Sequence, residues 1–148
     1  MKQVRRKKKF EFLEHTADIY IVAYGRSLEQ AFENAALATF EVMTDTDKVD
    51  PTVTETVEVE GSDEEALLYS WIENLLVRFD VERNLYAKFK LDPIQKKGRQ
   101  MKLRGTIYGE KFDAKKHPQK VGVKAVTYHR MEILKSPNEV SVKFILDI

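Results

Sequence analysis

The chain contains no cysteine, and this absence removes several classes of chemistry at once. Catalysis by a thiolate, zinc binding through cysteines and stabilisation by disulfides are all excluded. A reducing compartment, the cytoplasm, is therefore the expected location. No run approaches the roughly 18–20 apolar residues of a membrane span, and no apolar stretch follows the basic start. We therefore expect neither a signal peptide nor a membrane partner.

After the first nine residues, acidic residues outnumber basic ones. Six of the 25 Lys and Arg residues lie in residues 1–9, which leaves 19 against 24 acidic residues from Phe10 onward. An acidic body is a poor binder of phosphate backbones through its general field. The basic run alone could attract RNA or a membrane surface without specificity. We expect residues 1–9 to be a disordered basic tail and residues 10–148 to form one domain.

Two segments carry apolar side chains at helical spacing. Residues 28–43 follow a capping box formed by Ser27 and Gln30, which predicts an amphipathic helix. A second apolar stripe over residues 67–79 follows a capping box formed by Ser62 and Glu65. Trp71 lies at the centre of that stripe, so we expect it in the core rather than in a ligand site.

Alternating apolar residues predict strands on either side of these helices. Gly105 is a candidate bulge, and DAKKHPQK, residues 113–120, is a predicted loop in which His117 marks only a turn. The order predicts an α+β fold, a single domain with two amphipathic helices packed on a largely antiparallel β-sheet. The expected strands are 10–13, 19–24, 53–59, 85–91, 101–107, 121–125 and 140–146.

A candidate site combines residues from both ends of the chain. EHTAD, residues 14–18, interrupts two strand-like segments with an imidazole, a hydroxyl and two carboxylates. At the other end, the apolar face of the last strand turns Asp147 the opposite way, beside the terminal carboxylate of Ile148. If the first and last strands are neighbours, Asp18, Asp147 and Ile148 meet at one rim. A hard divalent cation would neutralise their oxygens there.

The chemistry of these groups narrows the choice of ion but leaves a structural role open. Oxygen ligands without sulfur favour calcium, magnesium or manganese over zinc. His15 could bind the ion or orient Asp18. However, an aspartate in a turn often binds its own backbone. Lys124 lies opposite the apolar face of its predicted strand, and we expect it to be solvated.

Several segments together resemble the archease family. The resemblance spans residues 10–148, and the basic run before Phe10 lies outside the family pattern. The matching segments are EHTAD at 14–18, GRSLEQAFENAA at 25–36, LLYSWIENLL at 67–76, VKAVTYH at 123–129 and the short C-terminus that contains Asp147.

This resemblance implies a protein cofactor and not a free-standing enzyme, so no catalytic residue is expected. Archeases assist the RtcB-type RNA ligase, which joins tRNA exon halves with GTP and metal ions during tRNA splicing. They promote guanylylation of the ligase and its multiple turnover, and RNA is reached only through the ligase. The resemblance also implies a divalent cation, calcium before magnesium or manganese, on Asp18, Asp147 and Ile148. It places His15 and Lys124 at the same functional tip.

Two other functions remain open at this point. A chaperone-like modulator of a tRNA-modifying methyltransferase would use an exposed apolar patch and would tolerate loss of the metal ligands. A stand-alone metal-dependent phosphohydrolase acting through Asp18 and Asp147 has less support. The sequence offers it no general base beyond His15 and no loop that cradles phosphate.

Overall fold

The computed structural model describes residues 8–13 and 18–148 of the chain. The expected basic tail therefore lies outside the described residues, except for Lys8 and Lys9, which are exposed. The elements are β1 (Phe10–Leu13), β2 (Ile19–Gly25), α1 (Leu28–Met43), the 3-10 helix η1 (Thr46–Lys48), β3 (Val53–Gly61), α2 (Glu64–Glu82), β4 (Asn84–Leu91), β5 (Gln95–Lys97), β6 (Gln100–Lys111), β7 (Ala125–Lys135) and β8 (Val140–Asp147).

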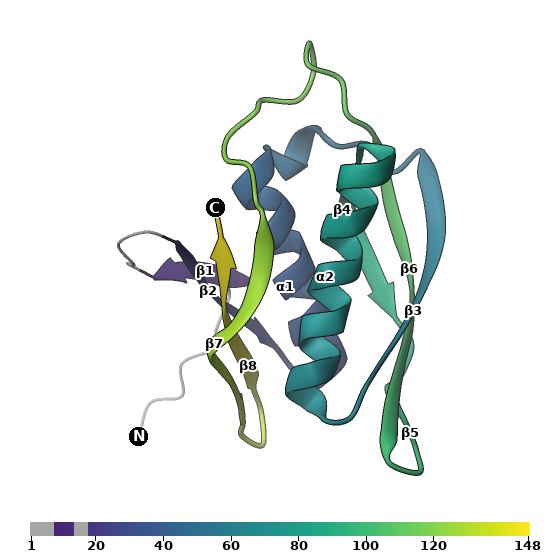
Figure 1. Ribbon diagram of the computed structural model, residues 1–148, viewed down its shortest axis with the longest axis vertical. Helices are drawn as coiled ribbons and strands as arrows, with labels where there is room; N and C mark the ends of the chain where they lie inside the picture. The colour runs from purple at the N-terminus through teal and green to yellow at the C-terminus, as the bar shows by residue number, and fades with distance from the viewer. Residues whose placement is uncertain (1–7, 14–17) are drawn as a thin grey trace.

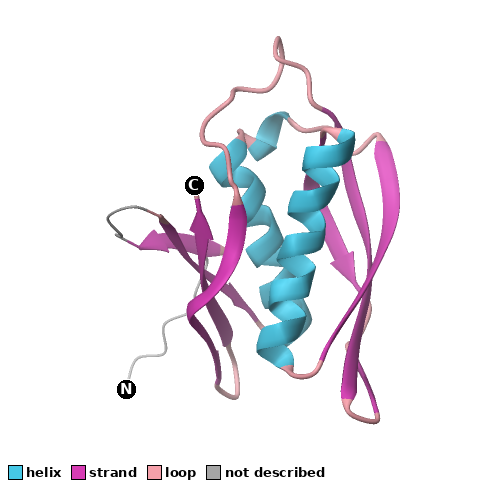
Figure 2. Ribbon diagram, viewed as in Figure 1, coloured by secondary structure: helices cyan, strands magenta, loops and turns pink. Residues whose placement is uncertain are grey.

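The strands form two separate antiparallel sheets with the two α-helices between them (Figures 1 and 2). One sheet has the order β1-β2-β8-β7, and the other has the order β3-β6-β4 with β5 paired to β6. Helix α1 packs against β2 and β4, and α2 packs against β3 and β7, so each helix contacts both sheets. The predicted α+β class is confirmed, but the expected single sheet is two. Each helix carries buried apolar side chains on two sides. One sheet can cover only one side of a helix, so a second sheet covers the other.

Trp71 of α2 is fully buried between the layers, as predicted. Its indole Nε1–H donates to the carbonyl oxygen of Phe32 in α1 at 2.9 Å. The ring of Phe89 in β4 meets the indole edge-on, with the centroids 6.2 Å apart. This one side chain therefore joins both helices to the second sheet. Among helices of the described chain, none is long and apolar enough to cross a membrane.

The two helices start at capping residues, one where the sequence predicts and one a residue later. Ser27 Oγ accepts from the backbone N–H of Gln30 at 3.1 Å, so the predicted start of α1 is confirmed. The predicted cap Ser62 is wrong, because Asp63 caps α2 and accepts from the N–H of Ala66 at 2.7 Å. A carboxylate at this position satisfies an unpaired N–H and also stabilises the positive end of the helix dipole.

The predicted strand at residues 121–125 is wrong. The N–H groups of Lys120 and Val121 donate to the last carbonyls of α1, those of Met43 and Val42, at 3.0 and 3.2 Å. This segment therefore caps α1, and β7 begins only at Ala125.

Bulges explain two other differences from the predicted strands, one in β7 and one in β4. In β7, Thr127 pairs with Ile145 and Glu132 with Lys143, so four residues of β7 stand opposite one residue of β8. This interruption breaks the alternation and hides β7 from sequence reasoning. The bulge expected at Gly105 lies instead between Tyr86 and Lys88 in β4.

Gly105 itself keeps regular register and serves close packing. A Cβ atom there would lie 2.3 Å from Leu91 Cδ2. The short strand β5 was not expected from the sequence, because its three exposed residues carry no apolar alternation.

Candidate metal centre

The beginning of β2 and the end of β8 lie side by side. These strands are antiparallel neighbours, and Ile19 pairs with Leu146. Asp18 directly precedes Ile19 and Asp147 directly follows Leu146, so the two aspartates are the next residues beyond the last pair of this ladder. If the alternation continues by one residue, both carboxylates lie on the sheet face that points away from the helices. The structure thus brings together the two aspartates that the sequence singles out.

Lys124 and Ile148 complete this end of the sheet, which we call the rim (Asp18, Lys124, Asp147 and Ile148). The backbone N–H of Lys124 donates to the carbonyl oxygen of Asp147 at 2.7 Å. The next residue, Ala125, pairs with Asp147, so β7 adjoins the other side of β8. The side chain of Lys124 is exposed, as predicted, and Ile148 is half-buried. The C-terminus lies at the end of β8, beside the start of β7 (Figure 1).

The rim gathers negative charge. Like charges directly opposite one another in a ladder are destabilising, and the terminal carboxylate of Ile148 adds a third anionic group. The Asp147 carboxylate forms no ion pair with any residue that the structure describes. This set of oxygen donors fits a hard divalent cation. Within residues 8–13 and 18–148, no three His, Asp or Glu side chains are grouped to hold an ion. His15 lies outside the described residues.

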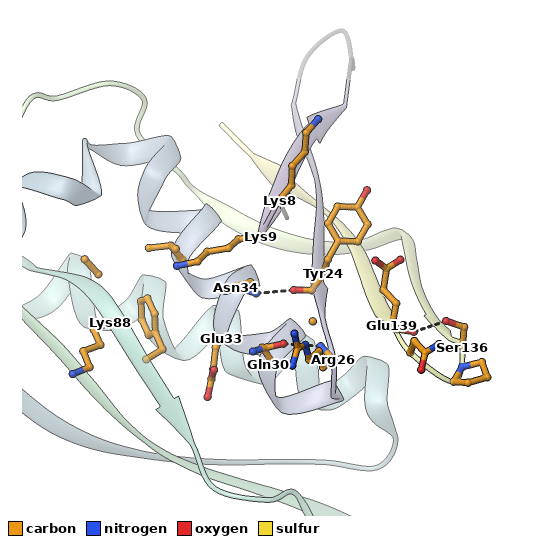
Figure 3. A pocket seen from close by; sticks show the side chains of 16 residues that line it. Lys8, Lys9, Tyr24, Arg26, Gln30, Glu33, Asn34, Lys88, Ser136 and Glu139 are labelled. Carbon is orange, nitrogen blue, oxygen red and sulfur yellow. Dashed lines mark hydrogen bonds between the residues drawn. The ribbon is translucent and has the colours of Figure 1, made fainter. Parts of the chain in front are cut away.

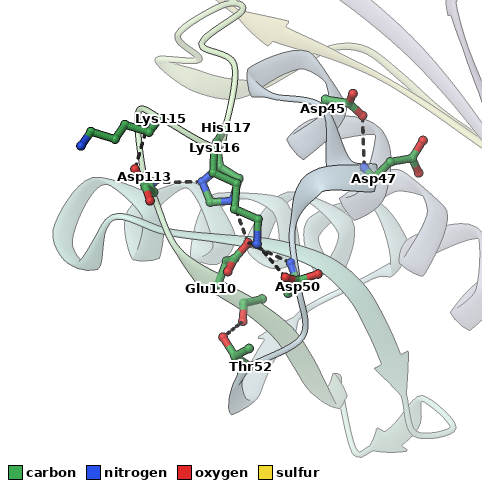
Figure 4. Close-up of polar contacts among 10 residues, drawn as sticks. Asp45, Asp47, Asp50, Thr52, Glu110, Asp113, Lys115, Lys116 and His117 are labelled. Carbon is green, nitrogen blue, oxygen red and sulfur yellow. Dashed lines mark hydrogen bonds and ion pairs between the residues drawn. The ribbon is translucent and has the colours of Figure 1, made fainter.

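A second polar cluster, the loop network (Asp50, Glu110, Lys116 and His117), lies where the loop after β6 folds back (Figure 4). His117 Nε2 lies 2.8 Å from Glu110 Oε2, and the same oxygen is 2.7 Å from Lys116 Nζ. Lys116 Nζ also binds Asp50 Oδ2 at 2.6 Å. The ammonium group thus lies between the two carboxylates.

His117 is buried, and sequence reasoning missed this role. The expected turn exists, because the N–H of His117 donates to the carbonyl oxygen of Asp113 at 2.8 Å. In addition, the N–H of Asp113 donates to His117 Nδ1 at 2.9 Å, which leaves Nε2 to donate to Glu110. The available signal was the spacing of Glu110, at the end of a strand, from a histidine seven residues later.

Glu110 is strongly stabilised in its charged form. Partial burial by itself raises the pKa of this carboxyl. Hydrogen bonds from Lys116, from the backbone of Asp50 and from His117 outweigh it and lower the pKa to about 2. The loop network therefore supplies Glu110 with donors from its own chain.

A surface hollow lies away from the rim. It is an open groove of about 1210 Å³, lined by α1, by residues 87–89 of β4 and by the turn between β7 and β8 (Figure 3). The groove also contacts Gly25 at the far end of β2, so the length of this seven-residue strand separates it from Asp18. The groove is thus not part of the rim.

Comparison with protein families settles the classification. The family model described as the archease protein family matches residues 10–148. The chain belongs to the archease family. Relatives named protein archease include one from Sulfurisphaera tokodaii, 52% identical over 95% of this chain and 99% of that protein. Another, from Pyrococcus furiosus, is 48% identical over 88% of this chain and 92% of that protein.

Solved structures agree with the archease classification. The solution structure of Methanobacterium thermoautotrophicum protein 1598 is similar with a TM-score of 0.83 and 43% identity, over 95% of this chain and 99% of that one. The crystal structure of a Thermotoga maritima archease, described as a possible chaperone, has a TM-score of 0.59 at 18% identity, over 99% and 100% of the two chains. At that identity the second likeness concerns the fold alone.

Proposed function

We propose that this protein is a non-catalytic cofactor of an RtcB-type tRNA-splicing RNA ligase in the cytoplasm. It promotes guanylylation of the ligase and thereby its multiple turnover. Membership of the archease family supports this proposal. The observation that carries it is the register of β2 and β8, in which Ile19 pairs with Leu146, and Asp18 and Asp147 are the next residue at each strand end.

The rim is the part of the molecule that would act on the ligase. Asp18, Asp147 and the terminal carboxylate of Ile148 would hold a divalent cation, calcium before magnesium or manganese. When bound, the ion supplies positive charge that can neutralise phosphate oxygens.

Lys124 adds a second positive charge at the rim, where its backbone N–H is bonded to the carbonyl oxygen of Asp147. A positioned ammonium group stabilises charge that develops during nucleotide transfer. The acidic body complements the basic surface expected of an RNA-binding enzyme.

A multiple-turnover ligation assay with the cognate ligase tests the proposal. We expect Asp18→Ala and Asp147→Ala to abolish the stimulation of turnover, while ligase that is already guanylylated still completes one round. Glu58→Ala is the matched control, because Glu58 is an exposed carboxylate on the other sheet. Undiminished turnover with Asp147→Ala would overturn the proposal. The same assay without ligase tests the stand-alone phosphohydrolase, which would release product by itself.

A chaperone-like role is the second candidate, and one structural feature favours it. The side chains of Phe12 and Leu13 in the edge strand β1 are 48% and 37% exposed. An exposed apolar edge can cover unfolded or aggregation-prone partners. In this case Asp18→Ala would keep a tRNA-modifying methyltransferase as soluble as the wild type does, whereas Phe12→Ser would not. Equal loss with both variants would contradict it.

A further inference from the structure

The bulge of β7 presents three exposed residues beside α2. Tyr128, His129 and Arg130 all lie in the four-residue interruption that faces Phe144 of β8. Arg130 has a positive φ of 59°, which non-glycine residues adopt uncommonly. Backbone strain of this kind often accompanies a functional surface. The motif VKAVTYH contains Tyr128 and His129, and the rim uses only its lysine.

Tyr128 forms a flat stack with Tyr69 of α2. The ring centroids are 4.3 Å apart and the ring planes are inclined by only 5°. Tyr128 is nevertheless 54% exposed. Tyr69 thus holds the Tyr128 ring in one orientation, and much of that ring remains accessible to a partner.

The stack lies in an acidic environment. Along α2, Tyr69 stands four residues from both Glu65 and Glu73, which places all three on one helix face. Partial burial and the nearby Tyr69, followed by the charges of Asp63, Glu73 and Glu65, raise the pKa of the Tyr128 hydroxyl. The same four-residue spacing continues to Val77 and Val81, which are 53% and 74% exposed.

The stack lies close to the rim along β7. Strand β7 begins at Ala125, the partner of Asp147, and Tyr128 follows three residues later. At about 3.3 Å per residue, the stack lies roughly 10 Å from the rim along the strand. Because Tyr128 packs on α2 while Asp147 points away from the helices, a partner that engages both would wrap around the edge strand β7.

We propose that Tyr128, stacked on Tyr69 and flanked by Glu65 and Glu73, is the docking site for an arginine side chain of the partner protein. This inference rests on the proposed function, in which the partner is the RNA ligase. A guanidinium group lies flat on an aromatic ring and pairs with carboxylates through two parallel hydrogen bonds. RNA-binding enzymes expose arginine and lysine around their active sites, and an acidic surface attracts such partners.

Single-stranded RNA is the other ligand that could bind Tyr128. It would need positive charge around the ring, whereas an arginine side chain needs negative charge. A base would stack on Tyr128 while its phosphates used His129 and Arg130. Glu65 and Glu73 would repel those phosphates. The acidic side chains around the stack therefore favour arginine.

The dissociation constant of the complex with the cognate ligase tests this assignment. We expect Tyr128→Ala to weaken binding about tenfold, as for an aromatic anchor, and Tyr128→Phe to keep the wild-type value. The double variant Glu65→Gln, Glu73→Gln should weaken binding about threefold, more at low salt. Arg130→Asn, which removes a charge but tolerates the left-handed backbone, should leave binding unchanged or tighter. Tyr108→Ala and Glu58→Gln, both on the other sheet, are the matched controls.

Three outcomes decide the matter. Binding by Tyr128→Ala at the wild-type level overturns the inference. Weaker binding by Arg130→Asn with no effect of the double glutamine variant points to RNA and also overturns it. If the wild type does not bind the ligase, the proposed function fails. The inference is then decided by titrating the protein with a hexa-arginine and a hexa-lysine peptide. Amide shifts centred on Tyr69, Glu73 and Tyr128 with arginine alone support it, and any other pattern overturns it.

Discussion

Carboxylates gather at two places in this molecule, the rim and the loop network, and their surroundings differ. In the loop network, Glu110 accepts hydrogen bonds from Lys116, from His117 and from the backbone of Asp50, at 2.7, 2.8 and 2.9 Å. At the rim, Asp147 stands next to Asp18 in the ladder and forms no ion pair within the described part of the chain. Glu110 thus receives several donors from its own chain, whereas Asp147 has no ion pair with a described residue.

This difference separates a structural role from a functional one. A carboxylate that receives several donors from its own chain stabilises the fold, and its removal leaves those donors without a partner. A carboxylate placed opposite another one lowers stability. A bound cation would offset this loss. The comparison therefore predicts opposite responses to the loss of a carboxylate at the two places.

The largest expected effect concerns ion binding. We expect Asp147→Asn to weaken calcium binding by about 100-fold or more, because the loss of a direct ligand exceeds the effects known for residues behind the ligands. Isothermal titration calorimetry with calcium, magnesium and manganese measures this affinity. Glu110→Gln is the control and should bind as the wild type does. If only Glu110→Gln lost calcium binding, the ion would bind at the loop network and not at the rim.

Removal of the buried imidazole should give the next largest effect. His117→Ala leaves the N–H of Asp113 without its acceptor and takes one donor from Glu110. We expect the free energy of unfolding to fall by about 2 kcal/mol, with calcium affinity unchanged. Urea denaturation measures the first quantity. His129→Ala, at an exposed histidine, should stay within about 0.5 kcal/mol of the wild type. A harmless His117→Ala would contradict a structural role for the loop network.

Sequence reasoning found the rim more readily than the loop network, and the reason is physical. The rim depends on strand alternation, which leaves a pattern in the sequence, and on the pairing of β8 with β2, which the sequence could only suggest. The loop network joins Asp50 to Glu110 and Lys116 across 60 residues or more, and no periodicity records such a contact.

The fold divides in the same way. Helix α1 is evident from its cap and its apolar stripe, because both are local. The separation into two sheets is not evident, since it depends on which strands pair. Strand β7 is hidden because its bulge breaks the alternation on which a strand prediction rests.

Acid should reveal the contribution of the loop network to stability. The pKa of Glu110 is about 2 in the folded protein, below the value of 4.5 for an unperturbed glutamate. Its contribution to stability is therefore fully present above about pH 4.5 and is lost as the pH falls towards 2. Because the side chain is 16% exposed and its partner Lys116 is more so, solvent screening limits the contribution to about 1–2 kcal/mol. Glu110→Gln should lack this part of the pH dependence in denaturation curves between pH 5 and pH 2, and an unchanged curve would contradict the assignment.

The smallest expected effect is a gain in stability. Without divalent ions, Asp147→Asn should raise the free energy of unfolding by about 0.5 kcal/mol, because it removes one of two like charges that face each other in the ladder. The gain should shrink as salt rises, since these groups are near the surface and salt screens their repulsion. With saturating calcium the order should reverse, because only the wild type is stabilised by binding. Thermal unfolding in chelator and in calcium measures both cases. A loss of stability in chelator would mean that Asp147, like Glu110, is held by its own chain, and the contrast between the two places would disappear.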